Sequence, residues 1–179
     1  MNSNDWVSTS MPYVAPAEGS PPDTWAAEAA TRGRRGSQRI IHAGEVAASA
    51  DVAELLDVPE GAPVVVRRRV MYLDDRPCEL TDTYYPVAIA RGTGLAGTAK
   101  IPGGAVRLLA RLGHTGVRAR EDVQAGMPDQ EERETLQIGH EPVLRLTRLT
   151  LNHSDRPIQA DMMTMPAARQ RLRYEIRIE

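Results

Sequence analysis

Two stretches of the chain carry the same pattern of hydrophobic and polar positions. Residues 63–86 read PVVVRRRVMYLDDRPCELTDTYYP, and residues 142–166 read PVLRLTRLTLNHSDRPIQADMMTMP. In each stretch, a run of strand-forming residues reaches a polar bend with Asp-Arg-Pro and returns as a second such run, which is typical of a β-hairpin. The sequence therefore predicts two similar hairpins, about 80 residues apart.

The segments before the two hairpins also match. ADVAELLDVPEGAP precedes the first and PDQEERETLQIGHEP the second, each with the apolar spacing of a short amphipathic helix, at Leu56/Val58 and Leu136/Ile138. QRIIHAGEVAAS and GVRAREDVQAG, further upstream, each predict a strand. The repeated unit is strand, helix, hairpin. Because one unit cannot bury its own sheet face, two should pair into one pseudo-symmetric domain with a cleft where the halves meet.

The remaining segments complete the expected fold. Residues 1–23 are rich in Ser, Pro, Gly and Ala, and their prolines argue against regular structure, so we expect a flexible linker or N-terminal arm. TWAAEAATR, capped by Asp23 or Thr24, and IPGGAVRLLARLGH predict helices. PVAIARGTGLAGTAK predicts a loop and LRYEIRIE a last strand. Residues 24–179 should thus form one α+β domain, with an antiparallel sheet of about six strands and flanking helices.

Composition and charge narrow the function classes. A formal net charge of −2 argues against binding nucleic acid or anionic membrane over the whole surface. The single cysteine, Cys78, excludes an internal disulfide framework, which fits a reducing compartment. No apolar run approaches membrane-spanning length and MNSNDWVSTS lacks the regions of a signal peptide, so we expect a cytoplasmic protein.

Signatures of enzymes and of cofactor sites are mostly missing from the sequence. The four histidines are scattered without metal-ligand spacing, and Cys78 has no obvious base partner. Neither a phosphate-binding loop nor a dinucleotide fingerprint occurs. We therefore expect no catalytic residues, no metal and no cofactor. GRRGSQR at 33–39 is basic but lacks interleaved aromatic residues, which favours a solvated hinge over a nucleic-acid patch.

The order of these pieces resembles a known family. VAELLDVPEGAPV, RRRVMYLDDRPCELTDTYYP, the Gly-bearing helix, AREDVQA, PVLRLTR and DRPI follow one another as they do in the effector-sensing UTRA domain. That domain follows the winged helix of GntR-type transcription factors of the histidine-utilisation-repressor subfamily and shares the chorismate-lyase fold. The resemblance covers roughly residues 36–178. It implies a bacterial effector-binding domain with a small-molecule pocket between the pseudo-repeats.

The resemblance also implies partners. It suggests a homodimer that controls DNA binding by a winged helix, with no membrane partner. The winged helix expected before residue 24 is missing from this sequence, so the chain is either a fragment of a longer regulator or a free-standing sensor. Two other classes stay open: an interaction module that dimerises without ligand, and a lyase-like enzyme that would need an acid or base buried beside Arg69.

Arginines on the first strand of each hairpin are the leading candidates for ligand binding. In VVVRRRVMYL, alternation places Val65, Arg67, Arg69 and Met71 on one face. In similar sequences, two arginines at the positions of Arg69 and Met71 bind the anionic group of the effector, and Arg148 occupies the place of Arg69 in the second repeat. A planar guanidinium is well suited to hold a carboxylate or phosphate. The alternative is that these arginines lie on exposed strand faces or form structural salt bridges with Glu79, Asp82, Glu121 and Asp161.

Two positions depart from the pattern of the family. Met71 replaces an arginine, and Thr81 stands where family members usually carry a glutamate that binds ligand hydroxyls. The resemblance therefore points away from a phosphosugar and toward an apolar or singly charged metabolite, of which a carboxylate is one candidate. The alternative is that Glu79 or Asp82 takes over the role of that glutamate through a shift of register.

Three further features complete the candidate site. Gly103 and Gly104 open a predicted helix, where bare amides favour an anion, although they could instead only allow close packing. Met163 belongs to a methionine cluster in DMMTMP, which is adaptable enough to line a pocket but could equally fill the core. Asp161, in the same strand, is the last residue of the candidate set. The effector, the operator and the regulated genes do not follow from the sequence.

Overall fold

The computed structural model describes residues 6–15 and 23–176. The main sheet has the strand order β2-β3-β4-β7-β6-β5, with every neighbouring pair antiparallel. Its strands are β2 (Gly36–Ala47), β3 (Pro63–Leu73), β4 (Arg76–Pro86), β5 (Arg118–Gly126), β6 (Val143–Leu151) and β7 (Pro157–Pro166). A small parallel pair is formed by β1 (Trp6–Ser8) and β8 (Gln170–Leu172).

The helices are short. They are α1 (Met11–Val14), α2 (Thr24–Thr31), α3 (Ala50–Leu56), α4 (Val87–Ala90), α5 (Gly104–Arg111) and α6 (Gln130–Leu136), with a 3₁₀ turn η1 (Gly94–Ala96). Together with the antiparallel sheet they confirm the predicted α+β class.

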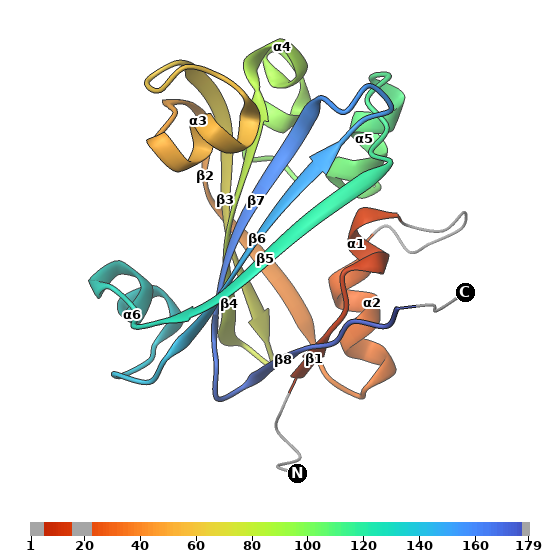
Figure 1. Cartoon of the computed structure of the whole chain (residues 1–179). Coiled ribbons are helices and arrows are strands. Elements are labelled where there is room, and N and C mark those ends of the chain that lie inside the picture. The colour runs from red at the N-terminus through yellow and green to blue at the C-terminus, as the bar shows by residue number, and fades with distance from the viewer. Residues whose placement is uncertain (1–5, 16–22, 177–179) are drawn as a thin grey trace.

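The strand order displays the internal repeat. β2, α3 and the β3–β4 hairpin are matched by β5, α6 and the β6–β7 hairpin, and the two hairpins join through β4 and β7 (Figure 1). Asp82 pairs with Met162 at this junction, and each residue lies five positions after its bend proline, Pro77 or Pro157. A pseudo-twofold axis therefore passes between β4 and β7.

The two repeat helices also match in detail. The side chain of Ser49 caps the start of α3, and that of Asp129 caps α6 within a capping box completed by Glu132. Both helices end on a residue in the left-handed region, Asp57 with φ 53° and Gln137 with φ 52°. Each helix is thus closed at both ends by its own sequence.

Helices cover the two faces of the sheet unequally. α3 and α6 lie against one face, which we call the α3/α6 face, and α1, α2 and α5 lie on the other, the α2/α5 face (Figure 1). β3 shows the predicted alternation, because Val64 and Val70 pack in clusters on the first face while Val65 and Met71 pack on the second. The core is therefore divided into several clusters on either side of the sheet.

The N-terminal segment departs from the expectation. Residues 6–15 hold regular structure, because β1 pairs with β8 and Pro12 lies in the first turn of α1, where no backbone N–H is needed. Trp6 is 2% exposed and packs edge-on against Trp25, with ring centroids 4.9 Å apart. The boundary between an arm and a domain at residue 24 stays a prediction.

Two other expectations need correction. Residues 87–96, expected as a loop, include α4 and η1, which close over Val65 and Tyr85 as one apolar cluster. The strand predicted over LRYEIRIE, residues 172–179, is wrong: β8 covers Gln170–Leu172 and shares only Leu172 with it, residues 173–176 have no regular structure, and residues 177–179 lie outside the described part. Its partner is the N-terminal β1, a pairing that its own sequence does not reveal.

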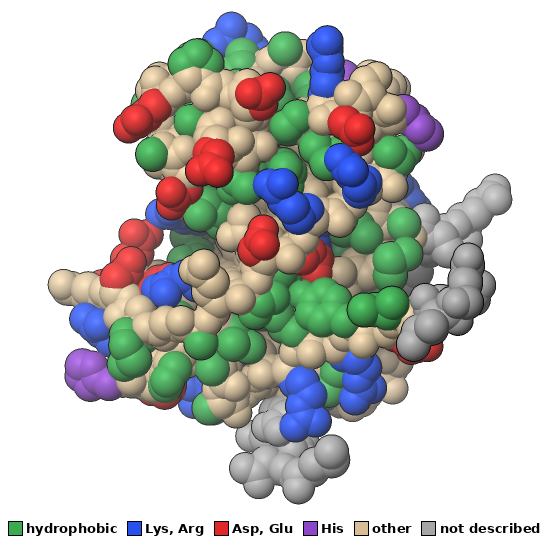
Figure 2. Space-filling model, in the orientation of Figure 1, with side chains coloured by type: hydrophobic (Ala, Val, Ile, Leu, Met, Phe, Trp, Pro, Cys, Tyr) green, Lys and Arg blue, Asp and Glu red, His purple; other side chains and the backbone are tan. Residues whose placement is uncertain are grey.

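Surface charge is mixed. Figure 2 shows acidic and basic side chains interspersed over the face in view, with hydrophobic groups between them. This distribution agrees with the formal net charge of −2. That face offers no broad single-sign surface of the kind that attracts nucleic acid.

Replacing Leu136 by alanine should lower the free energy of unfolding by about 2–5 kcal/mol, the cost of a cavity in a packed core. Leu136 is fully buried among Val70, Leu80 and Val143, between α6 and the sheet. Urea unfolding would measure the change. Leu112→Ala is the control, because Leu112 is 39% exposed and should change stability by no more than about 0.5 kcal/mol. Equal losses in the two variants would contradict the assigned core.

Candidate functional site

A cavity of about 120 Å³ lies on the α2/α5 face, between the sheet and the N-terminal segment. We call it the central cavity. Its floor comes from the four middle strands, because the register aligns their residues in rows across the pseudo-twofold axis. One row runs from Arg69 through Thr81 and Met163 to Leu146. Both hairpins therefore contribute to one site, as the duplicated sequence predicted.

Arg69 carries an incompletely satisfied cation. Its Nε atom is buried and has no hydrogen-bond partner within residues 6–15 and 23–176. Arg69 also borders a neighbouring cleft of about 370 Å³, which Arg39 and Lys100 help to line. Arg69 thus lies at the junction of two hollow spaces and has one donor atom without a partner among the described residues.

Glu79 faces the same cavity from the next row, where it pairs with Met71. The hydroxyl of Thr81 donates a hydrogen bond to its Oε1 atom. Burial raises the pKa of the Glu79 carboxyl above its ordinary 4.5, although the Thr81 hydrogen bond and the nearby Arg69 and Arg148 act in the opposite direction. The site therefore holds a carboxyl group that is costly to ionise in the empty cavity.

Arg148 is held in a different way. It is 7% exposed, and its Nε donates to Glu121 at 2.6 Å while Nη2 donates to Ser10 at 3.0 Å. Burial alone would raise the pKa of Glu121, but hydrogen bonds involving Ser10, Arg148 and Tyr174 outweigh it and lower this pKa. Arg148 is therefore one half of a buried ion pair and also a wall of the cavity.

The carboxylate of Asp161 is hydrogen-bonded by two neighbouring side chains. It is 2% exposed and accepts hydrogen bonds from the Thr83 hydroxyl and from Nε2 of Gln159, each at 2.7 Å. Tyr85 differs, because its buried hydroxyl has no partner among the described residues, and burial raises its pKa so that the phenol stays protonated. A buried polar atom left unpaired costs about 1–3 kcal/mol. Tyr85 and Arg69 therefore favour a polar guest.

The N-terminal segment forms the roof. Ser8, Thr9, Ser10 and Tyr13 line the cavity from above. The hydroxyl of Tyr13 donates to Glu28 of α2 at 2.5 Å, which ties the roof to the side wall. The segment that leads into the domain from the N-terminus is thus part of the site.

The predicted site residues fall into three groups. Five of them line the central cavity: Arg69, Met71, Arg148, Asp161 and Met163. Thr81 is fully buried below the floor, where its hydroxyl supports Glu79. Gly103 and Gly104, with φ 80° and 84°, lie at the start of α5, and the cavity is lined by the residues that follow them, Ala105 and Val106. Binding of ligand by any of these residues stays a prediction.

The sequence interpretation missed several wall residues. Tyr85 and Gln159 lie in the recognised hairpins, and alternation from Arg69 and Asp161 would have placed them on the same face. Ser8, Ser10 and Tyr13 gave no signal, because a Pro-rich segment shows no periodicity. Only the contact between β1 and β8 brings them over the sheet.

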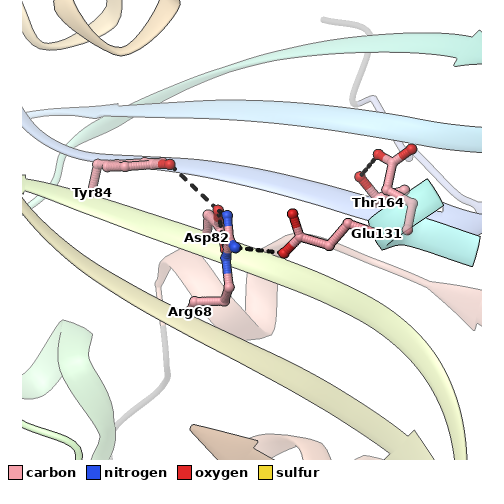
Figure 3. A network of polar contacts seen from close by, with 6 residues as sticks. Arg68, Asp82, Tyr84, Glu131 and Thr164 are labelled. Carbon is pink, nitrogen blue, oxygen red and sulfur yellow. Dashed lines mark hydrogen bonds and ion pairs between the residues drawn. The ribbon is translucent and has the colours of Figure 1, made fainter. Parts of the chain in front are cut away.

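The α3/α6 face carries a second hollow, which is lined by a network of polar contacts (Figure 3). In this groove of about 260 Å³, Arg68 donates two parallel bonds to Asp82, at 2.8 and 2.6 Å, and a third to Glu131 at 2.7 Å. Tyr84 donates to Asp82 at 3.4 Å, and burial followed by the Asp82 charge raises its pKa to about 12. These groups satisfy one another, so the network is structural and the central cavity remains the better site.

Comparison with known proteins agrees with the fold described above. Residues 31–171 match the UTRA domain family. The chain belongs to the UTRA domain family. Over 126 residues it is 32% identical to an uncharacterised HTH-type transcriptional regulator of Streptomyces coelicolor. The match covers 68% of this chain and 47% of that relative, so the chain spans about half of its length.

Solved structures share the UTRA fold. The effector domain of PhnF from Mycobacterium smegmatis superposes with a TM-score of 0.72 at 20% identity, over 88% of this chain and 97% of that one. A GntR-family transcriptional regulator from Bacillus cereus gives 0.68 at 17% identity, over 80% and 99%. At these identities the likeness establishes the fold alone. It confirms the six-stranded antiparallel arrangement predicted from the repeats.

Two searches of the described residues bear on the class of site. None of the helices formed by residues 6–15 and 23–176 is long and apolar enough to cross a membrane. Within the same residues, no group of three or more His, Cys, Asp and Glu side chains is placed to hold a metal ion.

Glu79→Gln should stabilise the ligand-free UTRA domain at neutral pH. The folded-state pKa of Glu79 is raised, so the folded state binds the proton more tightly than the unfolded state does. Its stabilising contribution is present below the ordinary value of 4.5 and is lost as pH rises through the folded-state pKa. Arg69, Arg148 and Asp161 face this carboxyl and stay unchanged in the variant.

Urea unfolding of parent and variant between pH 4 and 8 would measure this effect. The variant should gain stability relative to the parent as pH rises. Glu54→Gln is the matched control, because Glu54 is exposed on α3 and should show no such trend. A variant less stable than the parent at pH 8 would mean that the Glu79 carboxylate is held by a structural ion pair.

Proposed function

We propose that the chain is the effector-binding and dimerisation domain of a GntR-type transcriptional regulator, and that a small molecule in the central cavity controls DNA binding by the winged helix of the complete regulator. One observation supports this proposal most directly. The cavity is lined by Arg69 and Tyr85, each of which carries a buried polar atom without a partner among the described residues, and it lies where the two repeats meet. Membership of the UTRA family gives the regulatory context.

The roof offers a physical route from ligand to DNA binding. Ser8, Thr9, Ser10 and Tyr13 line the cavity and belong to the N-terminal segment that holds β1 and α1. A ligand that contacts Ser10 or Tyr13 would change the free energy of the closed roof, which is the differential interaction that any conformational coupling requires. In the proposed regulator, ligand binding in the cavity thereby shifts the conformation of the N-terminal segment, which leads toward the winged helix.

The assembly and location follow from the same proposal. A homodimer suits a regulator that binds two half-sites, and the cytoplasm is where its operator lies. A catalytic role has less support, because two of the four charged residues that line the cavity are already held by other side chains. Arg148 and Asp161 are fixed by Glu121, Thr83 and Gln159.

Arg69→Ala should weaken effector binding by about 1.5–3 kcal/mol, the range for a hydrogen bond to a charged group. A thermal-shift screen of metabolites would identify ligands, because a molecule that binds only the folded state raises the melting temperature by mass action. Calorimetry would then compare parent and variant. Arg35→Ala is the control, because Arg35 is exposed and pairs with Asp75 at the β3–β4 turn. Unchanged affinity in Arg69→Ala would remove Arg69 from the site.

The isolated chain should sediment as a dimer and should not bind duplex DNA with submicromolar affinity at physiological salt. Weak DNA binding is expected from the formal charge of −2 and the mixed surface in Figure 2, because such a surface releases few counterions from DNA. Analytical ultracentrifugation and fluorescence anisotropy with labelled duplexes would measure the two properties. Tight sequence-specific DNA binding by this chain alone would contradict the proposal that the winged helix of the complete regulator binds the DNA.

A further inference from the structure

Two opposite charges face the central cavity without pairing with each other. Arg69 and Glu79 both line it, yet no ion pair joins them in the part of the chain that the structure describes. Glu79 receives one hydrogen bond, from Thr81, and Nε of Arg69 has no partner there. The other charged wall residues are different, because Arg148 and Asp161 have partners of their own. Unused binding capacity is therefore concentrated on one cation and one carboxyl.

The two groups are close neighbours in the sheet. Arg69 pairs with Thr81 and Met71 pairs with Glu79, so Arg69 and Glu79 lie diagonally across β3 and β4 on the same face. Diagonal positions are separated by roughly 7–8 Å, within reach of long side chains. A guest that satisfies both must carry its own two opposite charges close together.

The balance of charge disfavours a strongly anionic guest. Two of the four charged residues that line the cavity are held by other side chains, Arg148 by Glu121 and Asp161 by Thr83 and Gln159, which leaves Arg69 and Glu79 to meet a ligand. A dianion would find one cation, Arg69, for its two charges, because Arg148 is already neutralised by Glu121. A guest without net charge, but with a separated ammonium and carboxylate, meets a partner at each end.

We propose, building on the proposed function, that the effector is a small apolar α-amino acid whose carboxylate is held by Arg69 and whose ammonium group is held by Glu79. The adjacent ammonium and carboxylate of an α-amino acid match the diagonal placement of the two side chains. The hydroxyl of Tyr85 remains to donate a further hydrogen bond to the guest.

The apolar residues that line the cavity determine which side chain of the ligand it can hold. Met71, Met163, Met165 and Leu146 present flexible apolar surface to the cavity. Its volume of about 120 Å³ is slightly below the roughly 150 Å³ of an engineered cavity that accepts benzene. The guest therefore has a hydrocarbon side chain of a few carbon atoms rather than a sugar ring with a phosphate.

The test uses the full chain with apolar amino acids as probes: alanine, valine, leucine, isoleucine, methionine and phenylalanine. Thermal shift selects the strongest binder, and calorimetry compares it with its deaminated acid and its decarboxylated amine, which for leucine are 4-methylpentanoate and 3-methylbutylamine. The parent should bind the amino acid at least about tenfold more tightly than either analogue, since each lacks one charge-assisted contact.

Two variants assign the contacts. Glu79→Gln should lose most of the preference for the amino acid over the deaminated acid, and Arg69→Gln should lose the preference over the amine. Such a cycle isolates each pair, because protein group and ligand group are removed separately and together. Glu54→Gln should change neither preference.

The remaining outcomes separate the two proposals. Binding of 4-methylpentanoate or glucosamine 6-phosphate, without binding of any amino acid, would overturn the amino-acid proposal and leave effector binding in place. A preference that survives in Glu79→Gln would overturn it too, as would a variant that melts below the parent at pH 8, since Glu79 would then be a structural partner of Arg69. A failure of every metabolite class to bind would overturn the effector function itself.

Discussion

The pairing of β4 with β7 is the interaction on which the rest of the structure depends. It joins the two repeats at equivalent positions, Asp82 and Met162, and so makes one continuous sheet from two hairpins. Each hairpin alone would expose a face and an edge, and isolated hairpins are marginal in water. Once joined, the register fixes which residues of the two copies share a row. The cavity floor is a direct consequence of that register.

The same register separates two kinds of polar chemistry by face. On the α3/α6 face, Arg68 and Asp82 bind each other, and Glu131 completes the network. One residue along the chain, Arg69 points to the opposite face and keeps unused donors. Because successive residues of a strand alternate between faces, neighbouring arginines of one RRR run acquire opposite roles. A shift of one residue would exchange them, which makes register the determinant of the site.

Much of the fold could be predicted from the sequence because the repeat encodes it locally. Each hairpin carries its own turn chemistry, and each helix its own cap, such as Ser49 and Asp129. Local signals of this kind do not depend on distant contacts. The N-terminal strand was not predicted, for the opposite reason. Trp6–Ser8 becomes a strand only because β8 lies beside it, and no pattern within MNSNDWVSTS reveals that partner.

The residues of the candidate site differ in the same way in whether the sequence predicts them. Arg69, Arg148, Asp161 and Met163 could be found because they lie on the repeated strands, whereas the roof residues Ser10 and Tyr13 could not.

The N-terminal segment that covers the cavity also affects the hydration of the charged groups beneath it. An open floor with Arg69 and Glu79 would be hydrated, and each charge would be screened by water. Ser8, Thr9, Ser10 and Tyr13 cover the cavity, and burial raises the pKa of Glu79. In the proposed function, a ligand that pairs with both groups would stabilise the closed roof more than an open one. The proposed coupling between cavity and N-terminal segment rests on desolvation, whichever ligand provides the matching charges.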